Sequence, residues 1–319
     1  MNYREEEVLV QGHYPLAATL GMPVGKGPFP AVVIVAGSGN GDRDGNIQKA
    51  KLSPNMYRDL AVFLGGLGCV TLRADKRGTG KSGGVFITTG MHDLVEDILT
   101  LADYLKAHPK VGKVILLGHS EGCTLIAAAN AKCPMDGLVF LAGGAESLND
   151  AVKRQRDLVS QEMRHMKGLK GALIRLTKAY NKVEKQAQKF NVKILATKKP
   201  VIRIQLQKMN ARWYREHLLY DVFEDLAKVT CPALAINGST DVQVTPEKAL
   251  ELGNYVKGPA EAHVIEGMNH LLKENSKQAS LLHIIKEYRA DMDKPLHPEL
   301  KERIADWLQK HDKSLAYPA

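Results

Sequence analysis

The sequence predicts a doubly wound α/β fold with a mostly parallel sheet and an inserted helical cap. Three observations lead to this prediction. Short apolar runs recur along the 319-residue chain, helical stretches lie between them, and one interval between two runs is much longer than the rest. Sheets of this type place ligands at the carboxyl ends of their strands. Site residues are therefore expected just after the apolar runs.

Six apolar runs have the continuous character of strands that are buried on both faces, as in a parallel sheet. They cover residues 31–37, 69–75, 113–119, 137–143, 232–238 and 262–267. Helices are expected between them, among others at 55–66, 91–107 and 121–132. Residues 5–11 and 14–23 predict an antiparallel pair of strands at the edge of the sheet.

Residues 146–228 are far more than a simple crossover between strands requires. They are rich in Lys, Arg, Gln and Leu, and a break is expected near residues 196–201. We interpret this segment as a helical cap inserted into a core that comprises residues 1–145 and 229–319.

Positive charge is concentrated in the cap. The chain has a net charge of +9, and residues 150–217 contribute +13, from 18 Lys and Arg against 5 Asp and Glu, which leaves −4 for the remainder. Such a surface attracts anions, so a basic module that binds nucleic acid or an anionic membrane is one functional hypothesis. The charges are interspersed with helix-forming residues, which favours a solvated face, and we do not expect a nucleic-acid partner.

The bulk composition excludes several other classes. No run of eighteen apolar residues is present, so no transmembrane segment is expected. The first residues lack the basic-then-apolar pattern of a signal peptide, which predicts a cytoplasmic protein. Without C-x-x-C pairing, reduced thiols are expected rather than a disulfide frame or a zinc site. The four thiols are those of Cys69, Cys123, Cys133 and Cys231.

Residues 80–82, Gly-Lys-Ser, imitate the end of a phosphate-binding loop. That motif requires a glycine six residues before the lysine, and Asp75 occupies this position. The dinucleotide motif G-x-G-x-x-G fails as well, because Asp42 follows Gly37 and Gly39 where the third glycine is required. Neither motif therefore predicts a bound nucleotide.

Residues 118–122, Gly-His-Ser-Glu-Gly, lie between an apolar run and a helical stretch. In this setting G-x-S-x-G is the pattern of a nucleophile elbow, a sharp turn whose small glycines allow strand and helix to approach closely. The turn raises the Ser120 hydroxyl above the sheet at a helix N-terminus, which favours developing negative charge. Ser120 is the candidate nucleophile.

A serine hydroxyl needs a base to take its proton and an acid to orient that base. The chain order in this fold is serine, acid, histidine. Asp241 and His270 follow the last two apolar runs, so both are expected at the edge of the sheet that carries Ser120. Glu146 is the alternative acid. The other histidines considered are expected to pack in the core or to belong to the cap, namely His119, His263, His165 and His217.

A tetrahedral intermediate on Ser120 would need N–H donors for its oxyanion. One is the backbone amide that follows the nucleophile, that of Glu121. The second is expected from the loop at residues 34–46. We assign it to Ser38, with Gly39 as the second choice.

These segments resemble the α/β-hydrolase superfamily, in particular its bacterial esterase and serine-aminopeptidase-like branch. The resemblance rests on GSGNGDRDGN, RADKRGTGKSGG, GHSEG, INGSTDVQV and GMNH, and it covers the whole chain except the loosely matched cap. It implies the Ser120, Asp241 and His270 triad with the Ser38 and Glu121 amides.

The resemblance also implies a structural role for the loop at residues 73–84. The loop residues that carry this role are Arg77, Gly78, Gly80 and Ser82. One position departs from the pattern, because Ala36 stands where a histidine often precedes the oxyanion glycine.

We therefore expect a serine hydrolase that cleaves small carboxylic esters with short-to-medium acyl groups through an acyl-enzyme, without a metal or organic cofactor. Peptidases, thioesterases and acyltransferases share this triad and remain alternatives. We hypothesise that the cap walls the acyl pocket and, through its charge, favours anionic esters. The favoured alternative for the charges is that they face solvent and keep the helices soluble. The apolar candidates for this wall are Leu169, Leu173, Ile174, Leu176, Ile202, Ile204 and Leu206. Packing within the cap is the favoured role of three further pocket candidates, Trp213, Arg215 and Tyr220.

Overall fold

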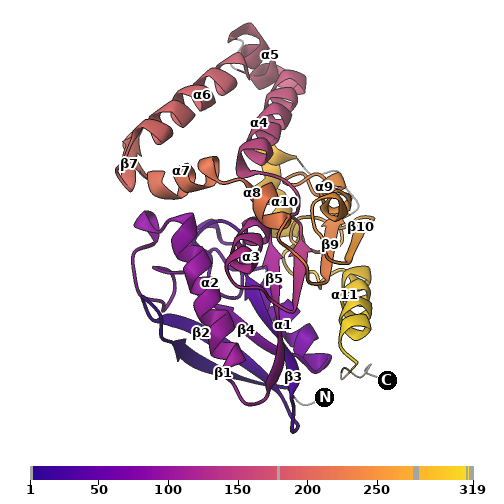
Figure 1. Cartoon of the computed structure of the whole chain (residues 1–319). Helices are drawn as coiled ribbons and strands as arrows, with labels where there is room; N and C mark the ends of the chain where they lie inside the picture. Colours follow the sequence, from indigo (N-terminus) through magenta and orange to yellow (C-terminus); the bar gives the residue numbers. More distant parts are fainter. Residues whose placement is uncertain (1–2, 178–179, 276–279, 314, 316–319) are drawn as a thin grey trace.

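The computed structural model describes residues 3–177, 180–275, 280–313 and 315. Its centre is an eight-stranded sheet with the strand order β1-β2-β4-β3-β5-β6-β9-β10 (Figure 1). In chain order these strands are β1 (Tyr3–Val10), β2 (Leu16–Pro23), β3 (Phe29–Val35), β4 (Val70–Ala74), β5 (Val111–His119), β6 (Gly137–Leu141), β9 (Ala233–Gly238) and β10 (Ala260–Ile265).

The pairing of the strands confirms the predicted doubly wound, mostly parallel sheet. In the order of the sheet, the six strands from β4 to β10 run parallel to one another. The expected antiparallel edge is formed by β1 and β2, with β2 antiparallel to both β1 and β4. Each of the six apolar runs forms one parallel strand. Side chains on both faces of β6 are buried along its whole length, which explains why the run shows no polar alternation.

Helices cover both faces of the sheet and form two hydrophobic layers. One layer contains α1 (Met56–Gly66) and α11 (Pro298–His311). The other contains α2 (Met91–Lys106), α3 (Glu121–Lys132) and α8 (Val222–Leu226). Neighbouring residues of β3 alternate between the layers, with Val32 in the first and Val33 in the second.

The segment between β6 and β9 forms most of the projection beyond the sheet in Figure 1. Its elements are α4 (Leu148–His165), α5 (Gly168–Thr177), α6 (Tyr180–Ala196), the hairpin of β7 (Val201–Ile204) and β8 (Gln207–Asn210), α7 (Ala211–Leu219) and α8. The expected break is present, since α6 ends at Ala196. The hairpin that follows was not predicted.

Short helical segments connect the remaining elements. They are α9 (Glu247–Leu250), α10 (Ile284–Asp291) and the 3-10 turns η1 (Gln48–Ala50), η2 (Phe86–Thr88), η3 (Leu252–Asn254) and η4 (Leu281–His283). All four cysteines are free thiols. Within the described ranges, no helix combines the length and the apolar character that crossing a bilayer would need.

Candidate active site

Ser120 occupies the sharp turn between β5 and α3. Its backbone has φ 54° and ψ −119°, a conformation that non-glycine residues rarely adopt and that is typical of functional sites. The Ser120 amide donates to the Leu141 carbonyl at 2.9 Å, which holds the turn in place. A Cβ on Gly118 would lie 2.4 Å from the Gly122 carbonyl oxygen, so only glycine allows this approach of strand and helix.

Asp241 and His270 lie together in the loops that follow β9 and β10. Asp241 Oδ2 is 2.7 Å from His270 Nδ1, and both residues are 6% exposed. The other carboxylate oxygen, Oδ1, accepts from the amides of Gln243 at 2.7 Å and Val244 at 3.1 Å. These bonds hold the carboxylate in position. With Nδ1 donating to Asp241, His270 Nε2 is free to accept a proton.

Glu146, the alternative acid, has a different partner. Its carboxylate forms an ion pair with the Arg154 guanidinium at 3.0 Å. The acid that contacts His270 in the structure is Asp241.

Ser120 and His270 line one cavity of ≈ 240 Å³. Its polar side includes the loop at residues 36–39, which follows β3. Its apolar wall comes from the segment at residues 47–56, from Leu271 and from the start of α10. The apolar side chains of this wall are Ile47, Leu52, Pro54, Met56, Leu271, Ile284, Ile285 and Tyr288.

Backbone amides beside Ser120 are available to an oxyanion. The Gly37 amide donates to the Tyr57 hydroxyl at 2.8 Å and is therefore occupied. The amides of Ser38 and Glu121 have no acceptor in the part of the chain that the structure describes, and the same holds for Gly39, the second choice for the loop donor. Ser38, in the loop after β3, and Glu121, at the start of α3, remain the donors that the sequence predicts.

His119 connects the loop after β3 to the backbone of His270. Its Nδ1 lies 3.0 Å from the Tyr57 hydroxyl and its Nε2 lies 2.9 Å from the His270 carbonyl oxygen. Burial, and secondarily the neighbouring His270, lowers the pKa of His119 to about 3. The neutral ring accepts from Tyr57 and donates to the carbonyl of His270. The sequence predicts only packing for His119, because the partners lie 62 and 151 residues away.

We expect this buried ring to make folding stability depend on pH. A histidine whose pKa is depressed in the folded state stabilises the fold above its unfolded pKa and loses that contribution as the pH falls. Its share of the unfolding free energy should drop by about 2 kcal/mol between pH 7 and pH 5. Urea denaturation at several pH values should show a shallower pH dependence for His119→Gln than for the wild type. The exposed His13→Gln variant is the control and should keep the wild-type slope, and equal slopes for all three proteins would refute the prediction.

The Glu121 side chain occupies a polar cluster that sequence analysis did not detect. Oε2 is 3.1 Å from Lys76 Nζ, and Oε1 accepts from Trp213 Nε1 at 2.6 Å and from His217 Nε2 at 2.9 Å. Burial raises the pKa of Glu121, but Lys76 and His217 outweigh this effect and lower the pKa to about 2. The sequence holds one signal for this cluster, an acidic residue directly after the nucleophile. An acid buried at that position needs hydrogen-bond donors or a positive charge around it.

The three cap residues predicted as pocket candidates do not line the cavity that contains Ser120. Trp213 donates to Glu121, as described above. Arg215 donates to the Thr197 carbonyl at 2.7 Å, and the Tyr220 hydroxyl donates to Asp225 at 2.7 Å. Trp213 and Tyr220 also pack against the core layer of α2, α3 and α8. Their contacts are those of cap packing.

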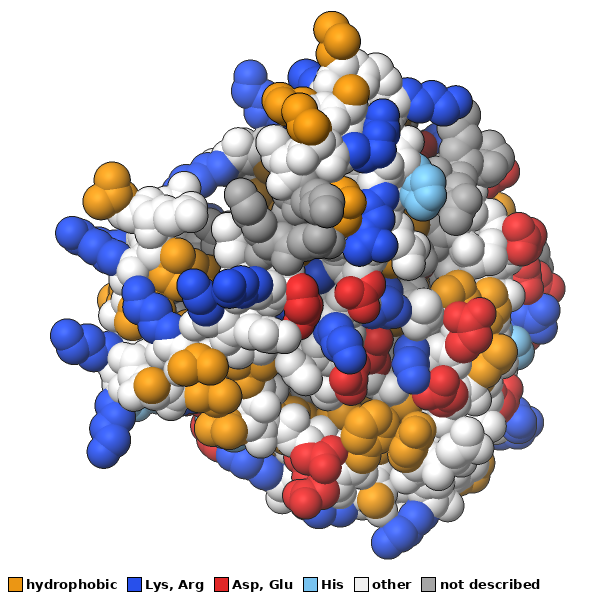
Figure 2. Space-filling model, turned by 90° about the horizontal axis from the view of Figure 1, so that it is seen from above, with side chains coloured by type: hydrophobic (Ala, Val, Ile, Leu, Met, Phe, Trp, Pro, Cys, Tyr) orange, Lys and Arg blue, Asp and Glu red, His pale blue; other side chains and the backbone are white. Residues whose placement is uncertain are grey.

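The prediction that leucines of the cap line the acyl pocket is wrong. Leu169, Leu173 and Leu176 of α5 are 91%, 61% and 82% exposed, and Leu206 in the β7–β8 turn is 93% exposed. Figure 2 shows hydrophobic side chains interspersed with Lys and Arg on this outer face. Helical periodicity predicts an apolar stripe, but it does not determine whether that stripe meets the core. Here α5 lies far from the sheet (Figure 1).

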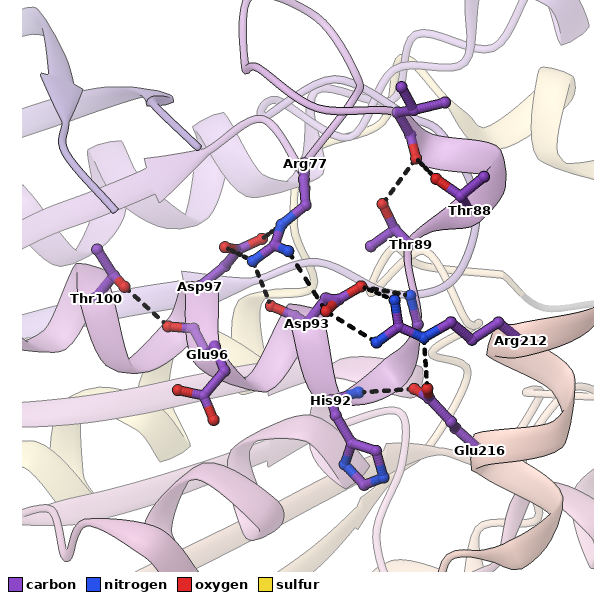
Figure 3. Close-up of polar contacts among 12 residues, drawn as sticks. Arg77, Thr88, Thr89, His92, Asp93, Glu96, Asp97, Thr100, Arg212 and Glu216 are labelled. Carbon is purple, nitrogen blue, oxygen red and sulfur yellow. Dashed lines mark hydrogen bonds and ion pairs between the residues drawn. The ribbon is translucent and has the colours of Figure 1, made fainter. Parts of the chain in front are cut away.

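The loop at residues 73–84 joins several elements beside the site. Arg77 binds Asp97 through Nε at 3.0 Å and through Nη2 at 2.6 Å, and it lies 3.5 Å from Asp93 (Figure 3). Gly78 and Gly80 have φ values of 73° and 49°, which favour glycine. The Ser82 hydroxyl donates to the Asp75 carbonyl.

The sheet, the elbow and the Asp241–His270 pair define an α/β hydrolase. A family model described as "Serine aminopeptidase, S33" matches residues 53–276, and the chain belongs to this family. Esterase EstD of Thermotoga maritima is 26% identical over 312 residues, which cover 97% of this chain and 68% of EstD. The chain is accordingly an enzyme, an α/β hydrolase of the esterase type.

Solved structures share the fold at low sequence identity. Est1E from Butyrivibrio proteoclasticus with bound ferulic acid has a TM-score of 0.58 and 18% identity, covering 94% of this chain and 99% of Est1E. A proline iminopeptidase from Mycobacterium smegmatis has a TM-score of 0.60 and 15% identity, covering 98% of this chain and 99% of that one.

Proposed function

We propose that this protein is a serine hydrolase that cleaves small carboxylic esters through an acyl-enzyme. The observation that carries the proposal is the 2.7 Å contact of Asp241 with a histidine, His270, that shares one cavity with the elbow serine, Ser120. The esterase EstD among the relatives supports an ester as substrate.

In the proposed reaction His270 Nε2 takes the proton of the Ser120 hydroxyl, and Ser120 Oγ attacks the ester carbonyl carbon. The amides of Ser38 and Glu121 donate to the oxyanion that forms. His270 then returns the proton to the departing alcohol, which leaves an acyl-enzyme. A water molecule, deprotonated by His270, releases the acid and restores Ser120. Asp241 stabilises the imidazolium in both halves.

The dimensions of the cavity favour a short-to-medium acyl group. Its volume of ≈ 240 Å³ is somewhat smaller than typical small-molecule pockets, which range from about 300 to 1,000 Å³. Its apolar wall is suited to an alkyl chain, and Ile284 stands in that wall at the start of α10.

We expect p-nitrophenyl butyrate and hexanoate to be hydrolysed with a higher kcat/KM than the dodecanoate. Each methylene that fits an apolar pocket contributes roughly 10-fold or more, whereas a chain that outgrows the pocket loses this benefit. Matched p-nitroanilides should be cleaved far more slowly. Anilide rates equal to the ester rates would favour the peptidase alternative, and a lack of ester turnover would refute the proposal.

The Ile284→Trp variant tests where the acyl chain of the substrate binds. A larger side chain in the cavity wall should lower kcat/KM for the hexanoate about 10-fold or more relative to the acetate. Leu173→Trp, which adds the same ring to the exposed cap helix α5, should leave the profile unchanged. A shift caused by Leu173→Trp and not by Ile284→Trp would place the acyl chain under the cap.

A further inference from the structure

Lys76 bridges the two loops that carry the free amides beside Ser120. It lies two residues after the end of β4, lines the cavity, and has a side chain that is 9% exposed. Its Nζ donates to the Gly37 carbonyl oxygen at 2.5 Å and to Glu121 Oε2 at 3.1 Å. Gly37 directly precedes Ser38, and Glu121 carries the second amide itself. One ammonium group therefore contacts both sides of the amide pair.

The Glu121 carboxylate extends this bridge to the cap. Its second oxygen accepts from Trp213 and His217, which are neighbours on one face of α7 at positions i and i+4. The Glu121 side chain is 4% exposed, so the charge pair with Lys76 is shielded from solvent. Through Glu121, helix α7 of the cap contacts the first residue after the nucleophile.

Helix α7 is also fixed to the core at a second point. Arg212 lies 2.8 Å from Asp93 in the first turn of α2, and Figure 3 shows Arg77 reaching the same aspartate. Glu216 binds Arg212 at 2.7 Å and accepts from the His92 amide at 3.1 Å. Since α7 is anchored independently, its donors can hold Glu121 against a fixed support.

We propose that Lys76 is a positioning residue that sets the separation of the Ser38 and Glu121 amides, and that α7 of the cap supports it through Glu121. The inference rests on the proposed ester hydrolysis. Lys76 supplies no proton and forms no bond to substrate in this role. Its ammonium fixes the Gly37 carbonyl and the Glu121 side chain, so both amides meet a developing oxyanion without rearrangement.

The expected cost of losing this bridge follows from the sensitivity of such donors to geometry. Removing one oxyanion donor typically lowers kcat about 100- to 1,000-fold. Lys76→Met keeps both amide donors but removes the contacts that hold them at a fixed separation. We therefore expect kcat to fall about 10- to 100-fold, with KM changed less than about 3-fold. Lys81→Met is the matched control. It lies in the same loop and has an exposed ion pair with Glu7, and it should remain within about 2-fold of wild type.

The affinity of the enzyme for a tetrahedral adduct distinguishes a positioning role of Lys76 from a purely structural one. An alkyl boronic acid that adds to Ser120 should bind Lys76→Met more weakly by about the factor lost in kcat/KM. A residue that only stabilises the fold would lower the melting temperature and leave this affinity unchanged at temperatures where the variant is folded. If Lys76→Met does not fold, Lys76→Met combined with Glu121→Gln removes both charges. The folded double variant should show the same loss of kcat.

Trp213→Phe tests the cap. It removes one donor to Glu121 while retaining a ring in the same place, and it should lower kcat about 3- to 10-fold. Combined with Lys76→Met it should cost less than the product of the two effects, because both act through Glu121.

The outcomes are distinct. A wild-type protein without ester turnover refutes the proposed function. Wild-type turnover with equal kcat values for Lys76→Met and Lys81→Met, or a change in KM alone, overturns this inference and leaves the function in place. Unchanged kcat in Trp213→Phe, or losses that multiply fully in the combined variant, overturns the support by the cap.

Discussion

Ser120→Ala is expected to abolish ester hydrolysis while the protein stays folded. Loss of a serine nucleophile typically lowers kcat about 10⁶-fold, and the remaining rate comes from substrate binding and the oxyanion donors. Folding should persist because the elbow is held by backbone bonds. The Ser120 amide donates to Leu141 and its carbonyl accepts from the Cys123 amide at 2.9 Å, and alanine keeps both groups.

The measurement combines p-nitrophenyl butyrate turnover with labelling by a fluorophosphonate probe. Wild-type protein should be labelled at Ser120 alone, Ser120→Ala should not be labelled, and both should melt at similar temperatures. Mass spectrometry that finds the probe on another residue, or turnover that survives in Ser120→Ala, would contradict the assignment.

His270→Ala and Asp241→Asn form the second prediction, and both should slow acylation by orders of magnitude. His270 transfers the proton, so its loss should cost at least as much as that of Asp241. An asparagine in place of the acid typically costs about 10⁴-fold, because the imidazole is held in the wrong tautomer. The 2.7 Å contact between Asp241 and His270 is the one that this substitution alters.

Glu146→Gln provides the matched control for the acid. Glu146 pairs with Arg154 and not with His270, so the variant keeps the Asp241–His270 contact and should lose far less kcat than Asp241→Asn. Rapid-mixing measurement of the p-nitrophenol burst reports acylation directly. Near-normal acylation in Asp241→Asn together with a severe defect in Glu146→Gln would transfer the acid role to Glu146.

Much of the fold could be predicted from the sequence because each feature leaves a pattern within a few neighbouring residues. The apolar runs are continuous since strands such as β6 are covered on both faces. The elbow was recognisable because close packing at Gly118 and Gly122 tolerates no side chain. Asp241 and His270 could be predicted to meet because the carboxyl ends of parallel strands share one edge.

The orientation of the cap could not be predicted from such local signals. The sequence established that residues 146–228 exceed a crossover, and that α5 has a row of leucines. Whether that row faces the site depends on the direction in which α4 leaves the sheet, which is a matter of packing over long distances. The apolar side chains that line the cavity beside Ser120 lie largely in residues 47–56 and α10, on segments that carry no motif.

Sequence alone was enough to predict the sheet, the elbow and the chain order of Ser120, Asp241 and His270, because strand burial, tight turns and strand order act over a few residues at a time. The partners of Glu121, in contrast, became known only from the folded chain. The contact of Lys76 with Glu121 spans 45 positions and that of Glu121 with His217 spans 96. A buried charge must be paired, but no local pattern states with which residue, since that choice is made when helices and loops from distant parts of the chain close on the same point.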